Sequence, residues 1–297
     1  MDRKIKRRVC MFTTLTVVYI AGYLLVTYYK NEKIIYTTYN SRSQYSIFSG
    51  NSKSTSRTEN IDMSHMSLTG HEEARIKTCA HNLSLKVRYD SARKFLTLNK
   101  SLCWTHHTYL KGNTSFLIEV GGNKGDDSEK FQNIYSPKHI ILEPVLIYYN
   151  RLTERFKENR RVTVLNFGLG NVSKQVNVVV HEPGGLGTSI YENKNGSTEI
   201  TIVNAIEFFK NIGVGQTEVD LLFLDCEGCE YIVLECLIKA NMIQFFKNIQ
   251  FEGHSHLPGI KLPFQRYCTI CELLSRTHRP TFRFILYYEN WRRTDLP

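Results

Sequence analysis

An apolar run that ends abruptly in acidic residues constrains this chain more than any other feature. The run covers residues 221–224 and is followed by Asp225-Cys226-Glu227-Gly228-Cys229-Glu230. Such a run is typical of a buried strand in a parallel sheet, with the acids at its carboxyl end. Because open parallel α/β sheets bind ligands at that edge, the sequence predicts a site around Asp225, Glu227, Gly228 and Glu230. Acids that only complement the dipole of a following helix are the alternative.

A strand, turn and helix pattern occurs earlier in the chain. A short buried strand is predicted over residues 114–120, a helix over about 128–134, and the turn between them reads Gly121-Gly122-Asn123-Lys124-Gly125. Glycines let the backbone approach a ligand closely, and the acid Glu119 at the strand end can accept hydrogen bonds. The spacing differs from the Gly-x-Gly-x-x-Gly fingerprint, and no Gly-Lys-Ser/Thr follows, which argues against NAD and ATP.

The next predicted strand, residues 139–142, ends on Glu143. An acid at the tip of the second strand is placed to accept hydrogen bonds from both hydroxyls of a ribose. Together with the glycine turn, it indicates a nucleoside ligand without a pyrophosphate, and S-adenosylmethionine (SAM) fits that description. The predicted cofactor-binding residues are Glu119, Gly121, Asn123, Gly125, Glu143 and Asp225.

Six segments in order resemble the FkbM family of SAM-dependent methyltransferases. They are Ile118 to Gly125, Leu142-Glu143-Pro144, Asn166 to Asn171, Gly187-Thr188-Ser189, Val219 to Glu230, and Phe251-Glu252-Gly253-His254. The usual family turn has aspartate where this chain has Glu119, and the usual Asp-Val-Glu-Gly-Ala-Glu carries cysteines here at positions 226 and 229. The resemblance implies a SAM cofactor and O-methylation of a hydroxyl, commonly on a sugar or polyketide.

The fold that the resemblance implies is α/β: a class I, Rossmann-like methyltransferase, with a mostly parallel sheet and helices on both faces. We expect its strands near residues 116–120, 140–143, 162–167, 219–225, 249–252 and 282–288. Added short strands at 175–180 and 199–203 flank the glycine-rich segment 184–189. That segment is expected to cover the site as a lid, or to form a plain turn.

The apolar strand that ends on Glu252 is expected beside the strand that ends at Asp225. His254 would then face the same crevice, where its ordinary pKa suits a general base for a substrate hydroxyl. Glu227 and Glu252 would orient His254 or the acceptor. The alternative is that His254 is a loop histidine without a catalytic role. His256 is a weaker candidate for the general base.

The N-terminus predicts a membrane anchor. Five basic residues lie between Arg3 and Arg8, and residues 9–29 carry no charge, which is long enough to span a bilayer. The positive flank predicts a cytoplasmic tail over 1–8, a type II signal anchor over 9–29, a luminal stem over 30–75 and a methyltransferase domain over 76–297. A cleaved signal peptide is the alternative, but the segment lacks a small-residue exit.

The predicted location is the lumen of the Golgi or endoplasmic reticulum, which selects a glycan as the hydroxyl-bearing acceptor. Five glycosylation sequons follow the anchor, at Asn82, Asn99, Asn113, Asn171 and Asn195. The net charge of +10 belongs partly to the tail and stem. No basic patch interleaved with aromatic residues or other nucleic-acid motif accompanies it, so no nucleic-acid partner is expected.

Cysteine spacing predicts disulfides rather than a metal site. Seven cysteines remain beyond Cys10 of the anchor, and a bond between Cys79 and Cys103 is the expected pair. Cys226-x-x-Cys229 and Cys268-x-x-Cys271 have the form of a four-thiolate zinc site. Because the first pair lies inside a ligand-binding turn, a buried thiol or a disulfide is preferred among Cys226, Cys229, Cys236, Cys268 and Cys271, and no metal is predicted.

Two other functions fit parts of the sequence. A Golgi glycosyltransferase shares the type II layout and could use Asp225-x-Glu227 to hold a metal and a nucleotide sugar, although the glycine turn and Glu143 speak against it. A methyltransferase fold that binds without catalysis is suggested by the altered turn and the two cysteines around Glu227.

Overall fold

The computed structural model describes residues 64–181, 187–192 and 195–297. The predicted tail, the predicted anchor over 9–29 and most of the predicted stem lie outside these residues. Within the described part, no helix is both long enough and apolar enough to cross a membrane.

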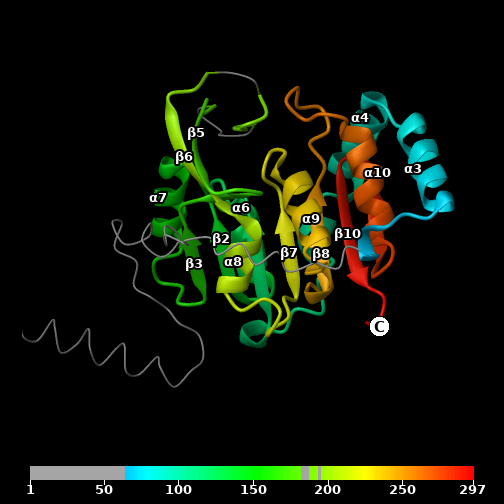
Figure 1. Ribbon diagram of the computed structural model, residues 1–297. Coiled ribbons are helices and arrows are strands. Elements are labelled where there is room, and N and C mark those ends of the chain that lie inside the picture. Colours follow the sequence, from blue (N-terminus) through cyan, green and yellow to red (C-terminus); the bar gives the residue numbers. More distant parts are fainter. Residues whose placement is uncertain (1–63, 182–186, 193–194) are drawn as a thin grey trace, which may run out of the picture. The chain divides into compact units, whose positions relative to one another are not determined.

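A mixed sheet of seven strands lies at the centre of the folded unit (Figure 1). Its order is β3-β2-β1-β7-β8-β10-β9, in which the first five strands run parallel and β10 is antiparallel to both of its neighbours. The predicted, mostly parallel sheet is therefore confirmed. The bounds are β1 Phe116–Val120, β2 Lys138–Leu142, β3 Val162–Leu165, β7 Leu221–Leu224, β8 Asn248–Glu252, β9 His278–Phe284 and β10 Tyr288–Arg293.

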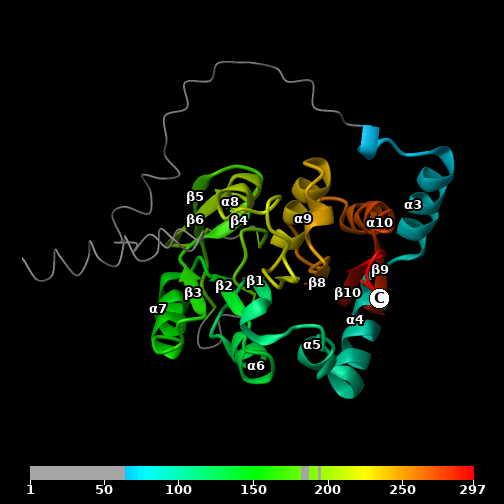
Figure 2. The same ribbon diagram turned by 90° about the horizontal axis from the view of Figure 1, so that it is seen from below.

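Helices cover both faces of this sheet, as Figure 2 shows. On one face lie α6 (Asp126–Ile134) and α7 (Leu146–Arg155); on the other lie α8 (Ala205–Asn211), α9 (Cys229–Lys239) and α10 (Pro263–Leu274). All four residues of β7 are fully buried. This double cover explains why the strand is an uninterrupted apolar run rather than an alternating one.

Within the part of the chain that the structure describes, three α-helices precede the sheet in sequence. They are α3 (Gly70–Asn82), α4 (Leu85–Lys94) and α5 (Leu102–Thr105), with α3 packed on α10 and α5 on α6. Thr69 and Glu72 form a reciprocal capping box that fixes the start of α3. Short helical turns occur at Ser64–Met66 (η1), Phe95–Asn99 (η2), Gly112–Thr114 (η3) and Ile243–Phe245 (η4).

A second, three-stranded sheet lies beside α7. It contains β4 (Gly168–Gly170), β5 (Lys174–Val178) and β6 (Thr198–Asn204), which confirms the added strands predicted at 175–180 and 199–203. Val178, Ile200 and Ile202 pack against Val145 and Tyr148 in one buried cluster. The small sheet thereby fixes the position of Tyr148 at the carboxyl edge of the main sheet.

The single strand predicted over 282–288 is wrong. β9 ends at Phe284, and β10 begins at Tyr288 after a tight turn. The turn residues are apolar, so the sequence carries no turn signal there, and Leu286 adopts a left-handed backbone conformation with φ of 62°. Its side chain is fully buried, and Gly253 N–H donates to Tyr287 O at 2.6 Å. Tertiary packing therefore sets this turn.

The predicted Cys79–Cys103 disulfide is also wrong. Cys79 bonds Cys268, which joins α3 to α10. Cys103 is a buried free thiol that donates to the Tyr288 hydroxyl at 3.1 Å. The helix pair α3 and α10 brings together cysteines that are 189 residues apart in sequence. Spacing along the chain could not reveal that pair.

Candidate functional site

The glycine turn after β1 is held by the end of β2. The N–H groups of Gly121 and Gly122 both donate to Leu142 O, at 2.9 and 3.1 Å. Asn123 and Gly125 have left-handed backbones with φ of 45° and 85°, and Gly125 caps the start of α6. The turn therefore presents its backbone at the carboxyl edge of the sheet, where the sequence predicted it.

Gly121 lies directly against the turn that follows β7. A Cβ at Gly121 would be 1.9 Å from Asp225 O, which no side chain tolerates. Its φ of 97° also disfavours any residue but glycine. Gly121 is thus required for the β1 and β7 turns to meet, and this close approach brings Asp225 to the same edge as the glycine turn.

Glu143 links two backbone segments from the tip of β2. Its Oε2 accepts the Asn123 N–H at 2.7 Å, and its Oε1 accepts the Val145 N–H at 2.8 Å. The residue is only 4% exposed, and burial raises the pKa of its carboxyl to about 7. Each carboxylate oxygen keeps a second acceptor site, so Glu143 can still receive hydrogen bonds from a ligand.

Glu119 points away from this edge and into the protein. Its Oε2 accepts the Ser128 hydroxyl at 2.7 Å and lies 2.9 Å from His139 Nε2. The residue is 1% exposed and does not line the cavity described below. Its side chain therefore joins β1 to α6 and β2, beneath the glycine turn.

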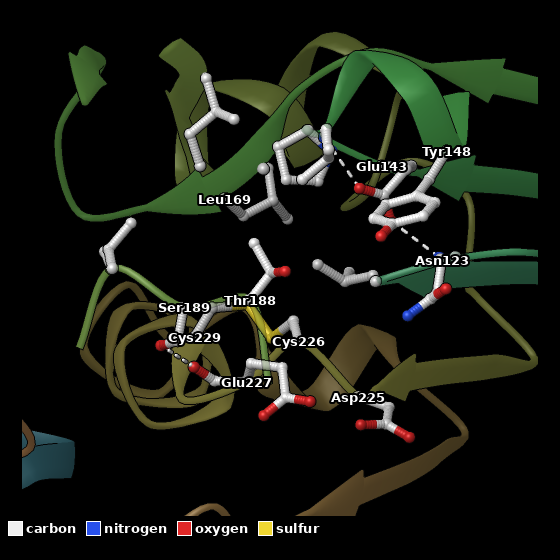
Figure 3. Close-up of a pocket in the computed structure, with 18 of the residues that line it drawn as sticks. Asn123, Glu143, Tyr148, Leu169, Thr188, Ser189, Asp225, Cys226, Glu227 and Cys229 are labelled. Atoms are coloured by element: carbon white, nitrogen blue, oxygen red, sulfur yellow. Dashed lines mark hydrogen bonds between the residues drawn. A yellow bond between two sulfur atoms is a disulfide. The ribbon is translucent and has the colours of Figure 1, made fainter. Parts of the chain in front are cut away.

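A cavity opens where these turns meet (Figure 3). Glu143 and Tyr148 lie on one side of it, and the Cys226–Cys229 disulfide and Glu227 lie on another. Thr188 and Ser189 contribute from the segment predicted as a lid, of which residues 187–189 are described. Ser189 Oγ donates to Glu227 O at 2.5 Å, and Gly187 N–H donates to Glu227 Oε1 at 2.7 Å. The lid segment is thus attached to the turn after β7.

The cavity lining is both acidic and apolar. Its charged residues are Lys124 and five carboxylates: Asp126, Asp127, Glu143, Asp225 and Glu227. Apolar walls come from the small sheet and α7, through Val145, Tyr148, Leu169, Ile190, Ile200 and Ile202. Such a lining favours a partly apolar ligand with positive charge and disfavours a pyrophosphate.

His254 lies beside Asp225, as the neighbouring ends of β7 and β8 predicted. Its Nε2 is 3.3 Å from Glu227 Oε2, 3.6 Å from Glu252 Oε1 and 3.8 Å from Asp225 Oδ1. The ring is buried and does not line the cavity, whereas Asp225 and Glu227 do. Asp225 and Glu227 therefore connect the cavity to the His254 ring.

Carboxylates decide the protonation of His254. Burial alone would lower its pKa, but Glu230, Glu252 and Glu227 together raise it well above the usual value. These carboxylates therefore favour the imidazolium form of the ring. Burial, and then the charge of Glu252, raises the pKa of Asp225 well above its ordinary range.

Arg88 is a site residue that the sequence did not indicate. It comes from α4, is 6% exposed, and donates to Glu252 Oε1 and Gly253 O, both at 3.0 Å. Its guanidinium also lies 5.1 Å from the centre of the Tyr287 ring. Arg88 thus partly neutralises Glu252, and nothing near position 88 in the sequence signals that contact. Tyr148 was also missed, and Glu230, although part of the predicted acidic run, was given no role of its own.

The cluster could hold a divalent cation on distance alone, because one ligand atom each from Asp225, Glu252 and His254 lies within 4.8 Å of the others. A metal would need Nε2 of His254 to be deprotonated, whereas the surrounding carboxylates favour its N–H. Arg88 already supplies positive charge beside Glu252, and we assign no metal to these residues. The four cysteines of the zinc-like pattern do not converge, since Cys226 bonds Cys229 and Cys268 bonds Cys79.

Comparison with known proteins gives one family match. Residues 119–258 match the family model described as a methyltransferase FkbM domain. No curated protein sequence matches this chain. Fibrillarin of Aeropyrum pernix, solved with SAM, is similar over 66% of this chain and 74% of its own, with 10% identity and a TM-score of 0.37. An O-methyltransferase from Bacillus cereus, solved with SAH, is similar over 76% and 92%, with 10% identity and a TM-score of 0.36. Structural likenesses at these scores carry no weight for this chain.

Proposed function

We propose that this chain, which carries a methyltransferase FkbM domain over residues 119–258, uses SAM to methylate a hydroxyl group. The observation that carries the proposal is the meeting of the glycine turn, Glu143 and Asp225 around one cavity. SAM would supply a methyl group on a sulfonium. Its positive sulfonium and ammonium groups suit the carboxylates of the lining, and it has no phosphate for them to repel.

The lining suggests how each part of SAM is held. Glu143 would accept hydrogen bonds from the ribose hydroxyls, Tyr148 would offer its ring to the adenine, and Gly121, Asn123 and Gly125 shape the turn beside the cavity. Asp225 would face the methionine part of the cofactor. Glu119 supports the turn from below through Ser128 and His139, rather than by contact with the cofactor.

The proposed chemistry is an in-line displacement at the methyl carbon. The acceptor oxygen forms a bond to that carbon as the bond from carbon to sulfur breaks, and the hydroxyl proton is lost. That proton passes to the carboxylate of Asp225 or Glu227, and from there to Nε2 of His254 in those molecules whose ring has already lost its Nε2 proton to solvent. Glu252, which is partly neutralised by Arg88, lies beside the same Nε2 atom.

We further propose that the acceptor is a glycan in the lumen of the Golgi or endoplasmic reticulum. The basis is the positively charged flank and uncharged segment over residues 3–29, which lie outside the described residues. Four of the five sequon asparagines are exposed, at positions 82, 113, 171 and 195, which is a condition for glycosylation. Removal of N-glycans should reduce the mass of the expressed full chain, and alkaline carbonate should leave it in membranes. A soluble, unglycosylated full chain would contradict the topology.

Transfer of an isotopically labelled methyl group tests the function. The full chain is incubated with labelled SAM and glycans from cells that lack the protein, and the glycans are analysed by mass spectrometry. We expect a labelled methyl ether with the wild type and none with Gly121→Ala. SAM binding without any transfer would favour a binding protein on a methyltransferase fold.

A further inference from the structure

Glu230 is a buried carboxylate that connects the turn after β7 with the segment after β8. It is 1% exposed, at the second position of α9. Its Oε2 accepts the Gly228 N–H at 3.0 Å. Its Oε1 accepts the backbone N–H of His254 at 2.9 Å and lies 3.1 Å from His254 Nδ1. All of these contacts can form at once only if Nδ1 carries a proton.

This arrangement fixes both the ring orientation and the tautomer of His254. With Nδ1–H directed at Glu230, Nε2 is the atom that faces Asp225, Glu227 and Glu252. A buried carboxylate on the remote nitrogen of a histidine also favours the imidazolium, because its charge is not screened by water. The charged and titratable groups around the ring are Asp225, Glu227, Glu230, Glu252, Arg88 and His256.

We infer that Glu230 is a positioning residue that sets the orientation and the proton affinity of His254 for the methyl-transfer reaction. The inference rests on the proposed function, because His254 matters for catalysis only if a hydroxyl proton reaches it. Glu230 itself touches neither the cavity nor the reacting atoms. Among the carboxylates around the ring, it has the largest effect on the His254 pKa.

Histidine NMR tests the inference independently of any activity. The full chain is labelled at histidine, and His254→Asn identifies the resonance of His254. In the wild type this ring should titrate well above the usual histidine range. In Glu230→Gln its midpoint should fall by about one pH unit or more, because one buried charge is removed. The matched control is Glu235→Gln, which removes a carboxylate of the same helix that pairs with Arg266 instead; it should leave the midpoint unchanged.

The pH dependence of methyl transfer is the second readout. If His254 accepts the proton, kcat rises as the ring loses its own proton, and Glu230→Gln should move that rise to lower pH with the KM for SAM unchanged. In a His254→Asn background, Glu230→Gln should cause no further shift in the pH dependence of kcat. A purely structural role would lower stability without moving the titration.

The outcomes separate the two proposals. If the His254 midpoint shifts in Glu230→Gln but no methyl transfer is found, the inference about His254's proton affinity stands and the proposed function fails. If methyl transfer occurs but the midpoint does not move, the inference is overturned. Should Glu230→Gln fail to fold, Glu230→Asp keeps the charge and should retain a raised midpoint; a fall to the ordinary histidine range in that variant would also overturn it.

Discussion

The carboxylate of Glu143 accepts the backbone N–H of Asn123 at 2.7 Å. The acid at the tip of β2 thus holds the turn that follows β1, so two segments 20 residues apart in sequence form one wall of the cavity. This contact makes Glu143 both a structural support of the turn and the residue best placed to receive ribose hydroxyls.

Replacement of Glu143 should weaken SAM binding. In Glu143→Ala the charge-assisted hydrogen bonds to the ribose are lost, which are worth about 1.5–3 kcal/mol, or about ten- to hundredfold in Kd. Calorimetric titration of the full chain measures this. Glu154→Ala, an exposed change on α7, is the control and should leave Kd unchanged. An unchanged Kd in a folded Glu143→Ala variant would remove Glu143 from the site.

The pH dependence of SAM binding should follow the same carboxyl. Burial raises the pKa of Glu143 from 4.5 to about 7 in the folded chain, so the carboxylate that binds the ribose is lost as pH falls below 7. SAM affinity should therefore decline on acidification through that range.

The stability of the ligand-free chain should respond in the opposite sense. A folded-state pKa above the unfolded value means that Glu143 contributes stability below about pH 4.5, and that this contribution is lost as pH rises towards 7. Thermal melts of wild type and Glu143→Gln across this range isolate the contribution. Equal pH slopes for the two proteins would contradict it.

Gly121→Ala should abolish SAM binding. The new Cβ would lie 1.9 Å from Asp225 O, so the turns after β1 and β7 could not both keep their positions. Gly213→Ala is the matched control, since Gly213 has a similar φ of 87° but no atom within 4 Å of the new Cβ. The control should lose only about 1–2 kcal/mol of unfolding free energy, from the left-handed backbone, and should still bind SAM. Normal SAM binding by Gly121→Ala would show that the two turns do not meet as described.

The disulfide between Cys79 and Cys268 should be found by peptide mapping under non-reducing conditions. Its removal in Cys79→Ser/Cys268→Ser should lower the free energy of unfolding by about 2–4 kcal/mol, because α3 is no longer tied to α10. Cys236→Ser, a change at a half-buried free thiol, controls for the loss of a cysteine. A peptide that joins Cys79 to Cys103 would contradict the assignment.

The main sheet and the residues at its strand ends could be predicted from the sequence. The buried strands β1 and β7 are continuous apolar runs, and each ends in residues with a strong local signal: glycines after Val120, and Asp225 after Leu224. Parallel pairing brings such ends to one edge. Glu143, Asp225, Glu227 and His254 could therefore be predicted to lie at the same edge of the sheet without knowledge of the side-chain contacts.

The contacts from distant elements could not be predicted in this way. Arg88 contacts Glu252, which lies 164 residues later in the sequence. Nothing in the sequence around position 88 distinguishes this buried arginine from arginines at the protein surface. Glu230 could be assigned to the acidic run, but its sequence position does not show that it is almost fully buried against His254. The direction of the Glu119 side chain could not be predicted either, since an acid at the end of a strand can face either the cavity or the interior.

Calorimetric titration of the full chain with SAM tests the central claim most directly, with UDP and manganese titrated in parallel. The acidic, partly apolar cavity predicts saturable binding of SAM at one site, competition by S-adenosylhomocysteine, and loss of binding in Gly121→Ala. No heat with SAM, together with saturable binding of UDP that requires manganese and is lost in Asp225→Ala, would contradict the account and favour a glycosyltransferase.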